Sequence, residues 1–171
     1  LLKLDEPFLY PVWYCFSPKT SIFNSESKKL WWKDLYFFID ILERENVRPW
    51  IWADYIWHHR EEFLRKIPED VILSNWYYGS EFNEDINYAK TFIDLEEGGY
   101  KQIPAGSNWS FSDNFPNLVD YCIKNISEEN LLGFLQTSWL PTTWSYIDGH
   151  IDAIDKVKEA KKRTGLWILP D

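Results

Sequence analysis

The stretch Arg48-Pro49-Trp50-Ile51-Trp52-Ala53-Asp54 indicates the fold class. It is a short apolar run between a proline and an acidic residue, and a helical segment at residues 59–66 follows it. Short apolar runs without strict alternation are typical of strands that are buried on both faces of a parallel sheet. The stretch therefore predicts one β-strand followed by one α-helix.

The same unit recurs along the chain. Further apolar runs begin at Leu1, Val71, Tyr100 and Leu131. Apolar residues at helical spacing occupy 31–42, 86–93, 118–123 and 147–157. Asn46 and Gly98-Gly99 mark helix ends. About five strands alternating with five helices predict a parallel α/β fold, either doubly wound or a barrel. No Gly-rich phosphate loop follows a strand, which disfavours a nucleotide-binding fold.

Length and charge limit the possible functions. The 171 residues suffice for one domain, whereas a complete (β/α)8 barrel needs about 250 residues. Because the sequence contains no Met, we expect residues 1–171 to be a single segment of a longer chain. A net charge of −9 with scattered Lys and Arg disfavours nucleic acid and anionic membrane surfaces. No apolar run is long enough to span a membrane.

The two cysteines, Cys15 and Cys122, do not form a disulfide framework. Cys122 lies in an apolar helical pattern and is expected to be a buried thiol, although a single bridge to Cys15 stays open. This cysteine content favours a reducing, cytoplasmic setting.

Aromatic residues gather where the predicted strands end. In parallel α/β folds these positions line the binding site. In chain order they are Asp5 and Glu6, Trp52 and Asp54, Trp76 and Tyr78, Asn108 and Trp109, then Thr137 and Trp139. Indole rings suit the C–H faces of a pyranose, and carboxylates suit its hydroxyls and glycosidic oxygen. The sequence therefore predicts a carbohydrate partner. Two plainer interpretations remain: Trp residues in the core, and Asp5-Glu6 as solvated loop charge.

Other chemistries lack support in the sequence. The pair His58-His59 has no third ligand at helical spacing and no HExxH motif, so an exposed helix start is expected instead of a metal site. The hydroxyls of Ser74, Ser107 and Ser138 have no Gly-x-Ser-x-Gly context, which disfavours a serine hydrolase. No cofactor is expected.

The order of these motifs resembles the second half of the catalytic barrel of family 20 glycoside hydrolases, the β-N-acetylhexosaminidases. Leu2-Lys3-Leu4-Asp5-Glu6 resembles the end of the fourth strand, and Trp50-Ile51-Trp52-Ala53-Asp54 the fifth. Leu73-Ser74-Asn75-Trp76 resembles the sixth strand, and residues 133–139 the eighth. The resemblance implies a partial (β/α)8 TIM barrel, strands four to eight with their helices.

The resemblance also implies a mechanism, retaining hydrolysis of β-linked N-acetylhexosaminides assisted by the substrate. Glu6 would protonate the leaving oxygen and later activate water, and Asp5 would orient the 2-acetamido group. The residues Trp52, Trp76 and Trp139 would wall the sugar subsite. Two departures stand out: Ser107-Asn108-Trp109 replaces the Tyr-x-Asp of the seventh strand, and Pro141 replaces an acid of the eighth.

These departures leave alternatives open. The chain is a glycosidase of this kind, a glycan-binding or degenerate barrel without catalysis, or a retaining glycosidase that uses Asp54 as its second carboxylate.

A half-barrel has open edge strands. We therefore expect the segment to require the missing N-terminal half of the barrel or a second copy for stability.

Overall fold

The computed structural model describes residues 25–165, so the expected strand at Leu1–Leu4 lies outside the described residues. The elements alternate along the chain. In order they are α1 (Ser25–Arg44), β1 (Trp50–Trp52), α2 (Ile56–Lys66), β2 (Ile72–Ser74), α3 (Asn87–Glu97), β3 (Ala105–Ser107), α4 (Asn114–Asn125), β4 (Leu135–Thr137), the 3₁₀ turn η1 (Trp144–Tyr146) and α5 (Ile147–Thr164).

The four described strands follow one another in space in the order of the sequence. β1 pairs with β2 and β3 pairs with β4, both in parallel. Isolated parallel bridges Leu73↔Gln102 and Trp76↔Ala105 connect the two pairs. Sequential parallel order is what successive βα units of a barrel would give. The described strands form no closed sheet, so the partial barrel stays a prediction.

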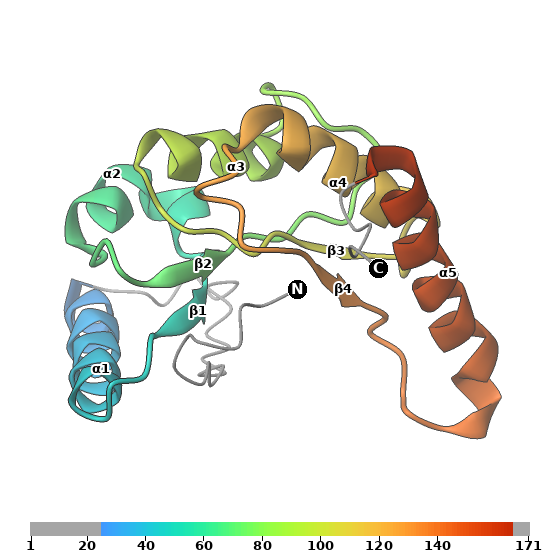
Figure 1. Cartoon of the computed structure of the whole chain (residues 1–171). Coiled ribbons are helices and arrows are strands. Elements are labelled where there is room, and N and C mark those ends of the chain that lie inside the picture. The colour runs from blue at the N-terminus through green and yellow to red at the C-terminus, as the bar shows by residue number, and fades with distance from the viewer. Residues whose placement is uncertain (1–24, 166–171) are drawn as a thin grey trace.

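The helices form an arch around one side of the strands, with α1 and α5 at its two ends (Figure 1). Ile51 and Leu73, from the middles of β1 and β2, are buried in a cluster with residues of α1 and α2, such as Trp32 and Phe63. Side chains alternate along a strand, so Trp50 and Ser74 face the other way. A hydrogen bond of 2.7 Å from Trp50 Nε1 to Ser74 Oγ places these two together on the inner side of the arch.

Close packing and ion pairs hold the helices in place. A Cβ atom on Gly106 would lie 2.9 Å from the Leu118 side chain, so α4 packs on β3 where no side chain intervenes. The Arg60 guanidinium of α2 binds both carboxylate oxygens of Asp94 in α3, at 2.5 and 2.6 Å. Lys156 of α5 bonds to Asp113 just before α4, at 2.7 Å. The Gly106 contact holds α4 on its own strand, and the two ion pairs fix one βα unit against the next.

Helix ends follow the sequence signals. Asn46 and Gly99 both adopt positive φ, and the next residues close the turn with hydrogen bonds from Val47 N–H to Leu42 O and from Tyr100 N–H to Leu95 O.

The apolar stripe of α5 is not covered by the described part of the chain. Its side chains are exposed, at 40% for Ile147, 49% for Ile151 and 56% for Ile154. None of the described helices is long and apolar enough to cross a membrane.

Candidate functional site

A row of aromatic rings runs along the edge where the strands end. Trp57, Trp76, Tyr78 and Trp139 follow one another with ring centroids 4.6, 4.9 and 6.4 Å apart. The rings of Trp76 and Tyr78 are stacked, and the other two contacts are edge-on. We call these four residues the aromatic row. It spans the carboxyl end of the strands from the start of α2 to the end of β4.

Asn75, the residue after β2, fixes one end of the aromatic row. It is fully buried, and its Oδ1 accepts a 2.8 Å hydrogen bond from the Trp57 indole. Its Nδ2 donates to the backbone carbonyl of Tyr88, whose ring also packs edge-on against Trp57 at 4.6 Å. One buried amide therefore orients Trp57 and ties it to α3.

Asn114, the first residue of α4, anchors the backbone on both sides of Tyr78, in the middle of the aromatic row. Its Nδ2 donates to the carbonyl oxygens of Tyr77 and Gly79, which flank Tyr78, at 3.0 and 2.7 Å. Its Oδ1 accepts from the backbone N–H of Ser107. The backbone on both sides of Tyr78 is thus anchored to the end of β3, which limits where the Tyr78 ring can lie.

The other end of the row is Trp139, which follows β4. Its backbone φ is 51°, an uncommon conformation for a side chain of this size, and its ring remains 51% exposed. Nearby, Thr137 Oγ1 donates to Gly106 O at 2.9 Å and lies 3.4 Å from the Tyr78 hydroxyl. An exposed indole beside hydroxyl groups offers an apolar face and polar partners to a ligand.

Asp54 is the carboxylate at the β1 end of this edge, two residues after Trp52. It is half-buried, and burial raises the pKa of its carboxyl above the ordinary value of 3.8. A hydrogen bond from its own backbone N–H offsets part of that rise. A carboxyl that is kept partly out of water suits a proton donor or a sugar-hydroxyl acceptor.

Two expected site residues within the described part of the chain, Asn108 and Trp109, do not join the aromatic row. Trp52 is the half-buried last residue of β1. Asn108 faces α5, since its Nδ2 donates to Gly149 O and to Asp152 at 2.7 Å, and its Oδ1 accepts from Gln136. Trp109 is 62% exposed, and no ring contact joins it to the row among residues 25–165. Asp5 and Glu6 lie outside the described residues.

Other possible sites are less developed. Within the described part of the chain, no three His, Cys, Asp or Glu side chains gather as metal ligands would. A shallow hollow of about 300 Å³ lies between residues 82–85 and the end of α4, and no strand-end residue lines it. Cys122 is a free, fully buried thiol whose pKa is raised by burial. The aromatic edge is therefore the best-formed candidate site.

Sequence reasoning did not single out the residues that organise this edge. Trp57, Tyr88, Asn75 and Asn114 were not expected to contribute. Asn75 carried a usable signal, because a polar residue inside a buried strand end needs hydrogen-bond partners. No family model matches the chain, and no curated protein and no solved structure shows significant similarity to it.

Proposed function

We propose that the aromatic edge binds a carbohydrate and that the chain is a glycoside hydrolase acting on β-linked N-acetylhexosaminides. The observation that carries the proposal is the aromatic row with Asp54 at the same strand edge. Exposed or half-exposed indoles offer flat apolar faces for a sugar ring, and Asp54 offers a hydrogen-bond acceptor. The sequence resemblance supplies the choice of amino sugar.

The proposed chemistry is substrate-assisted retention. Glu6 acts as general acid and then as general base, and Asp5 stays ionised beside the acetamido nitrogen, so that the acetamido oxygen attacks the anomeric carbon. Glu6 must be protonated when the substrate binds, which neighbouring indole rings would favour through desolvation. Trp52, Trp76 and Trp139 wall the sugar in this scheme.

Turnover of an aryl N-acetyl-β-glucosaminide tests the proposal. The chain should release the aryl alcohol, and Glu6→Gln should lower kcat by about a hundredfold or more, because the amide cannot donate and recover a proton. Full turnover by Glu6→Gln would remove Glu6 from the mechanism. Asp54→Asn distinguishes the scheme with two protein carboxylates, in which this variant loses as much activity as Glu6→Gln.

A second candidate is a glycan-binding barrel without catalysis. The observation that favours it is the engagement of Asn108, whose amide is occupied by Gly149, Asp152 and Gln136 and is not turned to the aromatic row. In the family that the sequence resembles, residues at the end of the seventh strand hold the sugar. Here the side chain at that position, Asn108, contacts α5 instead. Binding of amino sugars without any turnover would select this candidate.

A further inference from the structure

Ser138 and His150 form a hydrogen-bonded pair in the connection between β4 and α5. Ser138 Oγ lies 3.0 Å from His150 Nδ1, and His150 Nε2 lies 3.1 Å from the carbonyl oxygen of Pro141. Ser138 directly follows β4, and His150 sits in the first turn of α5. Both side chains are half-buried, so they are held in place and still reach solvent.

The Pro141 carbonyl determines which nitrogen of neutral His150 carries the proton. A carbonyl oxygen only accepts hydrogen bonds, so Nε2 must donate to it. Nδ1 then has a free lone pair and accepts from the Ser138 hydroxyl. A hydroxyl that donates to an imidazole, with the imidazole oriented by a third group, is the arrangement of an activated nucleophile.

A suitable oxyanion donor lies next to the pair. The backbone N–H of Trp139, the residue after Ser138, donates no hydrogen bond within residues 25–165. Trp139 is also the non-glycine residue with φ of 51°, so the chain turns sharply directly after the serine. In acyl-transfer enzymes the N–H that follows the nucleophile commonly stabilises the oxyanion.

From this geometry we propose that Ser138 and His150 are the nucleophile and general base of a second activity, hydrolysis of small carboxylic esters. Ser138 Oγ attacks the carbonyl carbon while its proton passes to His150 Nδ1. The C–O bond to the alcohol breaks, and the alcohol leaves with that proton. Water, deprotonated by His150, then cleaves the acyl–serine bond and releases the carboxylic acid, which restores the hydroxyl.

The proposal does not depend on the glycosidase function. The one residue that it shares with the amino-sugar mechanism is Trp139, which contributes its backbone N–H and its ring. The absence of Gly-x-Ser-x-Gly around Ser138 does not oppose it, since such constellations occur on unrelated folds and are recognised by geometry. The exposed Trp139 ring provides an apolar surface for the acyl group.

Hydrolysis of p-nitrophenyl acetate tests the inference, with the protein in the oligomeric form in which it is isolated. Wild type should turn over the ester, and Ser138→Ala and His150→Gln should each lower kcat by about a hundredfold or more. Ser145→Ala, an exposed serine of η1 in the same loop, should match wild type. A merely structural pair would shift the melting temperature in Ser138→Ala without any loss of turnover.

Covalent labelling needs no variant and covers the case in which Ser138→Ala fails to fold. A fluorophosphonate probe should phosphonylate wild type on Ser138, as mapped by peptide mass spectrometry. The inference is overturned if wild type shows no turnover above buffer, if Ser138→Ala retains it, or if the probe leaves Ser138 unmodified.

Discussion

The indole of Trp57 donates a 2.8 Å hydrogen bond to the side-chain oxygen of Asn75, a fully buried residue at the end of β2. The same amide donates to the Tyr88 carbonyl, so Asn75→Ala leaves the Trp57 indole N–H without this acceptor and removes one hydrogen bond to that carbonyl. We expect this variant to lower the free energy of unfolding by about 2 to 3 kcal/mol. Chemical denaturation followed by circular dichroism measures it.

Asn83→Ala provides the matched control, because Asn83 is exposed and its side chain accepts only from the nearby Asp85 N–H among the described residues. Its cost should stay below about 1 kcal/mol. Equal stability losses in the two variants would mean that Asn75 has no special role in holding Trp57.

Asp54 should make stability depend on pH in a defined direction. Burial raises the pKa of its carboxyl in the folded state above 3.8, so the folded protein favours the protonated form. The favourable contribution of this group is fully present below the unfolded pKa and is lost as pH rises through the folded pKa. Asp54→Asn should therefore melt at a higher temperature than wild type at pH 7, and at the same temperature at pH 3. A lower melting temperature at pH 7 would contradict this.

The ion pair of Arg60 with Asp94 should contribute measurably to stability. The Asp94 side chain is 3% exposed and is bound through two oxygens by Arg60. Arg60→Ala leaves that carboxylate buried without its main partner, and we expect a loss of about 2 kcal/mol. Lys158→Ala, which breaks an exposed pair with Asp155, should cost less than about 0.5 kcal/mol. Urea denaturation of both variants checks the difference.

The exposed stripe of α5 should drive self-association when the chain is studied alone. Ile147, Ile151 and Ile154 lie on one helical face and are 40 to 56% exposed, and a second copy is the available apolar partner. Ile151→Lys should shift sedimentation equilibrium toward monomer. A wild-type chain that is monomeric and unfolds cooperatively would oppose the expectation that this segment needs a partner.

Local signals in the sequence predicted several strands and helix ends. The run from Trp50 to Trp52 is a strand, and Asn46 and Gly99 end helices with positive φ, because these features depend on nearby residues. The apolar stripe that the spacing predicts in α5 is present, but the spacing leaves open whether the stripe is buried. Helical spacing predicts that one face is apolar, yet the structure buries Ala153 and Ala160 while the isoleucines stay exposed. Periodicity does not reveal what lies opposite a face.

The site was predictable only in part. Position after a strand identified Trp76, Tyr78 and Trp139, which the structure brings into ring contact. The same rule included Asn108 and Trp109, which lie apart from the row, since side-chain direction in a loop depends on contacts with distant residues such as Asp152. Trp57 was missed because it stands in a helix and not at a strand end.

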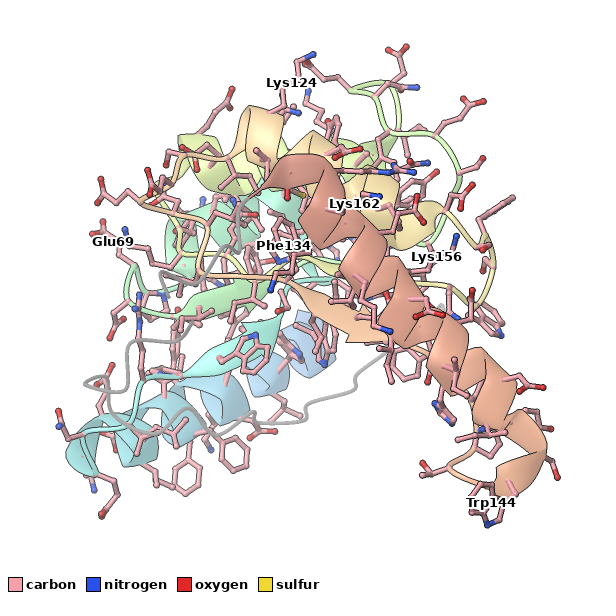
Figure 2. All side chains as sticks on the ribbon, turned by 45° about the vertical axis from the view of Figure 1, so that its right-hand side comes forward. Glu69, Lys124, Phe134, Trp144, Lys156 and Lys162 are labelled. Atoms are coloured by element: carbon pink, nitrogen blue, oxygen red, sulfur yellow. The ribbon has the colours of Figure 1, made fainter. Side chains whose placement is uncertain are left out.

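Carbohydrate binding at the aromatic row is the central claim, and a comparison of two tryptophans tests it most directly. Trp139 belongs to the row, whereas Trp144 projects from the tip of the loop before α5 and is 87% exposed (Figure 2). Titration calorimetry with N-acetylglucosamine, which has no glycosidic bond for the proposed enzyme to cleave, should show binding to wild type and equally to Trp144→Ala. Trp139→Ala should bind about tenfold more weakly, which corresponds to about 1.4 kcal/mol. Absence of binding to wild type, or equal binding by Trp139→Ala, would contradict the claim.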